Sequence, residues 1–245
     1  MLENNWLNRT ELLIGNEKLN KLRNSNIIVF GLGGVGSYVV EGLVRSGIEN
    51  IAIIDNDVVD VTNINRQLIA NTQTIGKNKI DVEKERILQI NPKANVIAIQ
   101  EFINKDNIEE IIYNINTKFN IHTNFNDKLN ISYIIDAIDT VSSKIELIKY
   151  CYNNNINLIS CMGTGNKLDA SKFEITDITK TSVCPLAKVI RKELRKLGIP
   201  HQKVLFSKEE PIKTNLNTPA SISFVPSVAG LLIAGNVVQD LISSN

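Results

Sequence analysis

The sequence of 245 residues has few cysteines and no excess of charge of either sign. Its three cysteines, Cys151, Cys161 and Cys184, lie far apart, with no CxxC pair and no cysteine–histidine pairing. We therefore expect neither a disulfide framework nor a structural zinc site, and we expect a reducing, cytoplasmic location. The formal net charge is +1, so no global field recruits nucleic acid, and any such contact must come from a local patch.

Long uninterrupted apolar runs are also absent. Residues 1–9 contain no apolar signal core. The most apolar late segment, 227–242, is interrupted by polar residues such as Asn236 and Asp240, and we expect a buried helix there rather than a stable membrane span. A chain of this length, 43% hydrophobic and 22% charged, can bury one good core, so we expect a single domain over residues 1–245.

The most informative stretch is residues 27–55. A short β-branched run, 27–30, leads directly into the glycine-rich turn GLGGVG, and an amphipathic helix follows it. A second apolar run, 51–54, ends at Asp55. A strand, a glycine turn, a helix and a second strand with an acidic end together form the complete context of a nucleotide-binding βαβ unit.

The glycines of this turn have separate physical roles in such a unit. One makes the tight turn, one lets a phosphate approach the backbone, and one packs the helix on the strand. The positive end of the helix attracts an anion, and the acidic residue suits a ribose hydroxyl. A purely structural turn is the competing interpretation, and the pattern does not say which nucleotide binds. The predicted nucleotide contacts are Gly31, Gly33, Gly34, Gly36 and Asp55.

Two cations follow Asp55. The motif NINRQ, residues 63–67, surrounds Arg66 with polar side chains, and the planar fork of an arginine matches phosphate oxygens. Further along, Lys79 stands at the start of a predicted helix, where it would add positive charge beside the phosphates. Solvated surface charge is the competing interpretation for both residues.

A later strand, 132–139, carries two aspartates toward its carboxyl end, the edge at which open α/β sheets bind ligands. Asp139, at the tip, is the candidate ligand for Mg²⁺ bridging phosphates, because this hard cation takes few carboxylates together with water and phosphate oxygens. Asp136 is deeper and is interpreted as structural. The alternative for Asp139 is an N-cap of the helix predicted over 142–152.

The alternation of strands and helices predicts an α/β fold, with a Rossmann-like, doubly wound, mainly parallel sheet. We expect a helical N-terminal arm over 1–25, a nucleotide-binding half over 26–165 and a substrate-facing half over 166–245. Residues 104–130 should form a helix followed by a polar spacer from 114 to 130.

The substrate-facing half should add short antiparallel strands at 173–178, 204–207 and 222–225. It also contains the densest basic surface of the sequence, on a helix predicted between 185 and 200. This helix is the candidate contact to a nucleic-acid backbone, and a solvated charged face is the alternative. The candidate nucleic-acid residues are Lys188, Arg191, Lys192, Arg195 and Lys196.

The glycine turn, Asp55, the NINRQ motif, the GKNK segment at 76–79 and the DAID segment at 136–139 together resemble the E1-like adenylating enzymes, the ThiF/MoeB/HesA superfamily. The NxNRQ element is the specific part. The resemblance implies that ATP binds the glycine turn and that a substrate carboxylate attacks the α-phosphate, giving an acyl-adenylate and pyrophosphate. By match of motif, it implies nucleoside contacts from Gly34 and Asp55, phosphate contacts from Asn63, Arg66 and Lys79, Mg²⁺ held by Asp139, and a homodimer in which Arg9 enters the partner's site.

Within the superfamily the chain is most similar to the tRNA threonylcarbamoyladenosine dehydratases, through segments 9–15, 136–140, 189–198 and 204–211. The resemblance implies that the threonine carboxylate on the modified adenosine is adenylated, that an internal nucleophile closes a ring, and that AMP leaves. The implied partner is tRNA carrying this group.

Three alternatives stay open. The first is adenylation of the C-terminal glycine of a ubiquitin-like sulfur carrier, although such activators usually carry zinc-binding CxxC pairs. A non-catalytic nucleotide-binding scaffold is the second, against which Arg66, Lys79 and Asp139 argue. An NAD-dependent oxidoreductase is the third, and it rests on the glycine fingerprint alone.

Overall fold

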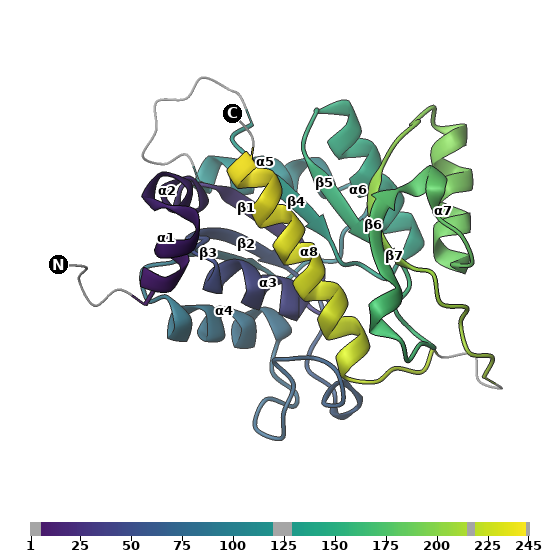
Figure 1. Cartoon of the computed structure of the whole chain (residues 1–245), viewed down its shortest axis with the longest axis horizontal. Coiled ribbons are helices and arrows are strands. Elements are labelled where there is room, and N and C mark those ends of the chain that lie inside the picture. Colours follow the sequence, from purple (N-terminus) through teal and green to yellow (C-terminus); the bar gives the residue numbers. More distant parts are fainter. Residues whose placement is uncertain (1–5, 120–128, 215–218, 244–245) are drawn as a thin grey trace.

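The computed structural model describes residues 6–119, 129–214 and 219–243. They form one seven-stranded sheet with helices on both faces (Figure 1), and its strand order is β3-β2-β1-β4-β5-β7-β6. The strands are β1 (Asn26–Phe30), β2 (Asn50–Ile54), β3 (Asn95–Ile99), β4 (Tyr133–Asp136), β5 (Leu158–Cys161), β6 (Phe173–Asp177) and β7 (Lys203–Ser207). The helices are α1 (Asn8–Ile14), α2 (Asn16–Arg23), α3 (Gly36–Arg45), α4 (Lys79–Ile90), α5 (Ile108–Phe119), α6 (Val141–Asn153), α7 (Pro185–Lys196) and α8 (Phe224–Ser243), with 3-10 turns η1 (Val61–Asn63), η2 (Ala170–Lys172) and η3 (Ile178–Lys180).

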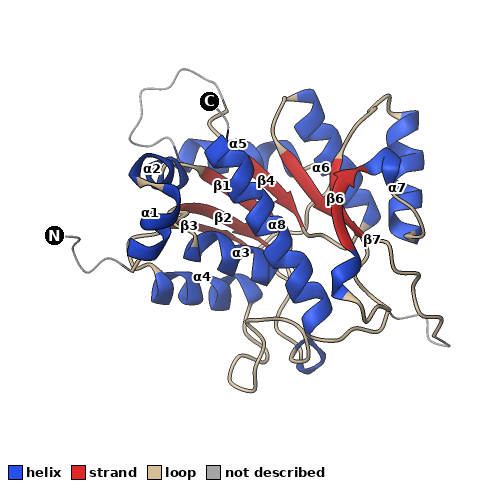
Figure 2. Cartoon of the chain, viewed as in Figure 1, coloured by secondary structure: helices blue, strands red, loops and turns tan. Residues whose placement is uncertain are grey.

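The sheet is parallel except at one edge, as Figure 2 shows. β1 pairs in parallel with both β2 and β4, and the parallel order continues through β5 to β7. Only β6 runs antiparallel, against β7. The expected doubly wound, mainly parallel sheet is thus confirmed. The chain winds outward from β1 in both directions, so the carboxyl ends of β1 and β4 form the switch point at which such sheets bind ligands.

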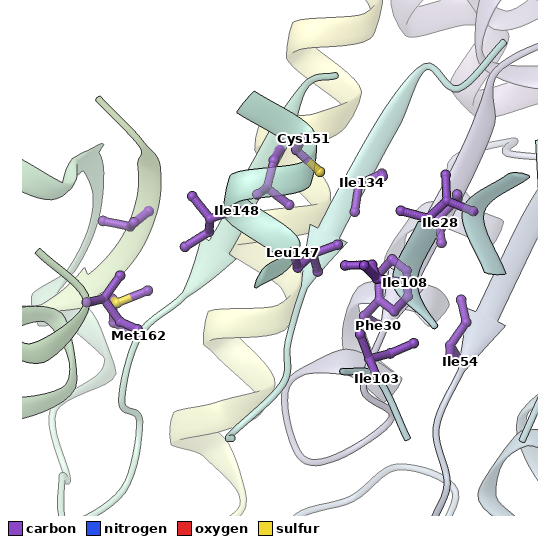
Figure 3. Packing of buried hydrophobic residues seen from close by; sticks show 14 of the residues in the cluster. Ile28, Phe30, Ile54, Ile103, Ile108, Ile134, Leu147, Ile148, Cys151 and Met162 are labelled. Atoms are coloured by element: carbon purple, nitrogen blue, oxygen red, sulfur yellow. The ribbon is translucent and has the colours of Figure 1, made fainter. Parts of the chain in front are cut away.

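Alternate residues of each central strand enter two separate cores, because successive side chains point to opposite faces of a sheet. On one face Ile28 and Phe30 belong to one buried cluster with Leu147 and Ile148 of α6 (Figure 3), to which α5 and α7 also contribute. The other face, which includes Ile27, is covered by α3, α4 and α8. Both faces of β1 are fully buried, which explains its continuous apolar run.

The last helix, α8, packs against α3 at very short range. A Cβ on Gly230 would lie 2.4 Å from the carbonyl oxygen of Val35, and one on Gly42 would lie 2.7 Å from the Cβ of Ala234. By length and composition alone α8 is apolar enough to cross a membrane, and 44% of that window is buried inside the molecule. The expected helix is confirmed, but its outer face exposes Leu231 and Leu232.

Two expectations about local structure were wrong. Residues 222–225 do not form a strand, because α8 begins at Phe224 and Pro226 lies in its first turn, where proline is tolerated. The polar spacer does not begin at residue 114, since α5 continues to Phe119. Residues 120–128 of that spacer lie outside the described residues, as do residues 1–5 of the N-terminal arm.

Candidate functional site

The glycine turn between β1 and α3 is folded too tightly for side chains at two positions. Gly31 has φ +88°, and a Cβ there would lie 2.7 Å from the carbonyl oxygen of Ala137. At Gly36, the first residue of α3, a Cβ would lie 1.8 Å from the carbonyl oxygen of Gly31. The turn therefore presents bare backbone at the start of a helix, an arrangement that binds anions.

Asp55 lies beside this turn, directly after β2. Its carboxylate accepts the backbone N–H groups of Leu32 at 2.6 Å and of Asp57 at 2.8 Å. Burial raises the pKa of Asp55 above its ordinary value, while Lys79 and the two N–H groups oppose that rise. The structure thus brings the predicted ribose-binding carboxylate to the glycine turn.

Lys79 is buried at the start of α4, with 4% of its surface exposed. Its Nζ lies 2.7 Å from Asp57 Oδ2 and 3.9 Å from Asp55 Oδ1. The interpretation of Lys79 as a solvated surface cation is therefore wrong. A bridge between Val58 and Asn78 sets this register, and sequence reasoning missed Asp57, whose only signal was its place two residues after Asp55.

The NINRQ segment folds around η1. Asn63 is buried, and its Oδ1 accepts the backbone N–H of Asp60 at 3.1 Å in a reciprocal capping box. Gln67, also buried, approaches Gly33: a Cβ on that glycine would lie 3.9 Å from Gln67 Nε2. Buried polar residues thus fix the loop that carries Arg66.

Arg66 is held above the glycine turn. Its Nη1 donates to the carbonyl oxygen of Thr62 and to Asn65 Oδ1, each at 2.9 Å. A Cβ on Gly34 would lie 3.3 Å from Arg66 Cγ and 3.2 Å from Pro226, so both side chains border this glycine. Pro226, from α8, was invisible to sequence reasoning because the contact is long-range.

Asp139 is exposed in the turn that joins β4 to α6. The N-cap of α6 is Thr140, so the interpretation of Asp139 as an N-cap is wrong. Within the described residues no group of three or more His, Cys, Asp or Glu forms a metal cluster. The Asp139 carboxylate accepts a hydrogen bond from Thr140 Oγ1 at 3.4 Å, and a single exposed carboxylate suits Mg²⁺, which takes its remaining ligands from phosphate oxygens and water.

Arg9 does not join these residues within the same chain. It is exposed on α1, and α1 packs at the amino edge of the sheet, where Leu7 and Leu19 approach Gly47 just before β2. The glycine turn and Asp139 lie at the carboxyl edge. Any role of Arg9 at a nucleotide site therefore requires a second chain.

The basic helix, α7, lies beyond β6 and β7 at the opposite end of the sheet from α4 (Figure 1). Arg191 is partly buried and donates to the carbonyl oxygen of Thr181 at 2.9 Å, so it fastens the preceding loop. Lys196 is engaged by Glu193 at 2.8 Å. The exposed cations that remain are Lys188, Lys192 and Arg195.

Comparison with known proteins identifies the family of this chain. The model of the ThiF family matches residues 7–244. The chain belongs to the ThiF family. Among curated ThiF-family relatives, tRNA threonylcarbamoyladenosine dehydratase of Bacillus subtilis (strain 168) is 42% identical over 252 residues, covering 96% of this chain and 93% of the relative. The enzyme of that name from Escherichia coli (strain K12) is 38% identical over 186 residues, covering 76% and 64%.

Solved structures of ThiF-type proteins agree with the fold. The crystal structure of E. coli tRNA N6-threonylcarbamoyladenosine dehydratase in complex with ATP superposes with a TM-score of 0.87 at 31% identity, covering 99% of this chain and 97% of that one. The same enzyme in complex with AMP gives the same TM-score. The sequence-based resemblance to the superfamily is confirmed.

Proposed function

We propose that this chain catalyses the ATP-dependent dehydration of N6-threonylcarbamoyladenosine in tRNA, through adenylation of the threonine carboxylate. One observation carries the proposal: Asp55 and Arg66 border a bare glycine turn, and the Lys79 ammonium lies 3.9 Å from Asp55, in a chain 42% identical over almost its whole length to a dehydratase of that name. Activation of a sulfur-carrier protein uses the same adenylation chemistry and is the alternative that the experiment must exclude.

ATP is proposed to bind along the glycine turn. The backbone N–H groups at the start of α3 and the positive end of that helix attract its phosphates. Asp55 accepts the ribose hydroxyl hydrogen bond. Arg66, on the NINRQ loop, and Lys79, at the start of α4, are the nearby cations, and charge that develops on the departing pyrophosphate is stabilised by such pre-positioned cations. In the structure the Lys79 ammonium pairs with Asp57, and from that position it is proposed to contact the phosphates.

The reaction is proposed in two steps. A threonine carboxylate oxygen attacks the α-phosphorus, the bond from that phosphorus to the bridging oxygen breaks, and pyrophosphate leaves. An internal nucleophile of the same substrate then attacks the activated carbonyl carbon, and the former carboxylate oxygen leaves with AMP. Ring closure within one bound molecule has a high effective concentration, so no enzyme cysteine is required.

Asp139 is the residue proposed to hold Mg²⁺. When bound, this ion neutralises charge on the phosphates, and an exposed carboxylate at the carboxyl edge is a suitable protein ligand for it. The catalytic set is thus Arg66, Lys79 and Asp139, with Arg9 supplied by a partner.

A cytoplasmic homodimer is the proposed assembly, with residues 1–245 acting as one adenylating unit. Leu12 and Leu13, on the helix that carries Arg9, are 73% and 84% exposed. Exposed apolar side chains of this kind favour a protein interface. For the tRNA, the exposed Lys188, Lys192 and Arg195 of α7 offer a phosphate-binding surface.

The test is AMP release from ATP and Mg²⁺ with three additives in parallel: tRNA bearing threonylcarbamoyladenosine, the same tRNA without it, and a sulfur-carrier protein. We expect turnover only with the modified tRNA, and a product nucleoside that has lost one water. Turnover only with the carrier protein would keep the adenylating centre and overturn the RNA substrate.

A further inference from the structure

A charged pair lies completely buried beneath the site. Lys144 of α6 and Asp136 of β4 have no exposed surface, and Lys144 Nζ lies 2.8 Å from Asp136 Oδ2. Removing two charges from water is costly, and exchange of such a pair for neutral side chains of similar volume is often neutral or stabilising. The free energy of unfolding alone therefore does not explain why this ion pair is present. The other hydrogen bonds of Asp136 and Lys144 indicate its function.

The second oxygen of Asp136 fixes the turn that follows β4. Asp136 Oδ1 accepts the backbone N–H of Ile138 at 3.1 Å, and Ala137 N–H donates to the carbonyl oxygen of Phe30 at 2.8 Å. These two bonds hold the backbone directly before Asp139. The carbonyl oxygen of Ala137 also lies against Gly31, so the same turn contacts the glycines proposed to bind the nucleotide.

The ammonium of Lys144 has a second partner on the neighbouring strand. It donates to the carbonyl oxygen of Cys161 at 2.9 Å, at the last residue of β5. The segment that follows, residues 162–165, leads into the half proposed to face the substrate. One buried ammonium thus joins the carboxyl ends of two adjacent strands.

We propose that Lys144 is a positioning residue for the adenylation reaction: through Asp136 it orients the turn that presents Asp139 to Mg²⁺ and the phosphates. The inference rests on the proposed function only in its use of Asp139 as the metal ligand. Side chains that orient a ligand in this way, without touching the metal, typically change metal affinity or activity by about 10–100-fold when replaced.

The informative variant removes both charges. Lys144→Met alone leaves Asp136 buried without its counter-ion, which is destabilising, so it is combined with Asp136→Asn. Lys149→Met is the matched control, because Lys149 lies on the same helix with its side chain 46% exposed. Melting temperature is measured for each protein without ligand, with ATP and EDTA, and with ATP over a Mg²⁺ titration.

We expect the double variant to fold with a lower melting temperature, because the buried Cys161 carbonyl loses its donor, and to bind metal-free ATP as well as the wild type does. Its Mg²⁺ half-saturation should rise about 10–100-fold, with a matching fall in the rate of AMP release at Mg²⁺ concentrations below half-saturation. The control should behave as wild type. Adding the two changes of the pair to Asp139→Asn should cause no further loss of the Mg²⁺ response, because the pair acts only through the Asp139 carboxylate.

Three outcomes would overturn the inference: a wild-type Mg²⁺ response in the double variant, an equal loss of ATP binding with and without the metal, or independent effects of the pair and Asp139. The melting measurements with ATP and Mg²⁺ need no tRNA, whereas AMP release does. If the wild-type chain does not turn over modified tRNA, the proposed substrate is wrong. The melting measurements still test the role of Lys144.

Discussion

Arg66 donates a hydrogen bond to Asn65 Oδ1 at 2.9 Å, and Asn65 Nδ2 in turn donates to the carbonyl oxygen of Ser221 at 3.1 Å. The phosphate-binding candidate is thereby tied to the segment that enters α8. Asn65 was not among the predicted site residues, although it lies within the NINRQ motif. Together with the carbonyl oxygen of Thr62, Asn65 restrains the guanidinium of Arg66 in one orientation.

Replacement of Arg66 should abolish most adenylation. We expect Arg66→Ala to lower kcat for AMP release about 10²–10³-fold, because it removes one pre-positioned cationic hydrogen-bond donor at the reacting phosphates. The melting temperature should change little, since the guanidinium packs in no core. Arg45→Ala is the control: Arg45 is 58% exposed and pairs only with Glu41 among the described contacts. Near-normal turnover of Arg66→Ala would contradict the site.

Charge reversal on α7 should weaken tRNA binding. The combined variant Lys188→Glu, Lys192→Glu and Arg195→Glu removes three exposed cations but spares Arg191, which fastens a loop. We expect lower affinity and a shallower salt dependence, with the slope of log K against log salt reduced by about 0.7–0.9 for each lost phosphate contact. Affinity is measured by titration at several salt concentrations.

The matched control reverses three exposed lysines at the other end of the molecule, Lys84, Lys93 and Lys105. It has the same change in net charge, so it separates a local contact from the overall field. Equal loss of affinity in both triple variants would remove α7 as the RNA surface.

Stability should depend on the protonation of Glu83, on α4. Both carboxylate oxygens are buried without a hydrogen-bond partner. Burial, and to a smaller extent the Glu41 carboxylate, raises the pKa of Glu83 well above 4.5. The folded chain therefore binds this proton more tightly than the unfolded chain. Its stabilising effect is complete below about pH 4.5 and is lost as pH rises through the folded-state pKa.

Glu83→Gln should accordingly equal the wild type near pH 4 and exceed it at pH 8. Each 1 kcal/mol corresponds to about 2–4 °C of melting temperature for a chain of this size, so the difference is measurable in thermal scans across pH. Glu85→Gln, at an exposed position of the same helix, is the control. Parallel curves for Glu83→Gln and the wild type would show that Glu83 is ionised in the folded state.

Two glycines of α8 should respond to alanine with opposite signs. At Gly230 a Cβ would meet the Val35 carbonyl at 2.4 Å, whereas at Gly235 nothing lies within 4 Å. We expect Gly230→Ala to lower the free energy of unfolding by about 1–3 kcal/mol. Gly235→Ala should raise it by about 0.5–1 kcal/mol, because alanine restricts the unfolded chain. Denaturant titration measures both, and equal effects would contradict the close packing of α8 on α3.

Local features of the fold and site were predictable from sequence. A β-branched run, a glycine turn and an amphipathic helix follow one another, so β1, the turn and α3 could be placed to within a few residues. Asp55 ends a strand, which put it at the carboxyl edge. The buried state of Asp136 was also foreseen, because it lies deeper in its strand than Asp139.

Contacts between distant segments were not predictable. Nothing local distinguishes Lys144, on an amphipathic helix, from a surface lysine, because its partners Asp136 and Cys161 lie on two different strands. The strand expected at 222–225 failed for a related reason. Its β-branched and aromatic residues favour a strand locally, but packing of the following apolar residues on α3 draws Phe224 into a helix.

The position of Pro226 beside Gly34 also sets an order of events during synthesis. The glycine turn leaves the ribosome well before Pro226, on the helix that covers α3 and borders the turn. A nascent chain that lacks α8 would leave the apolar surface of α3 uncovered and one wall of the nucleotide site missing. A nascent chain that has not yet reached Pro226 therefore lacks one of the two side chains that border Gly34, so the surroundings of the glycine turn form only after α8 has been made.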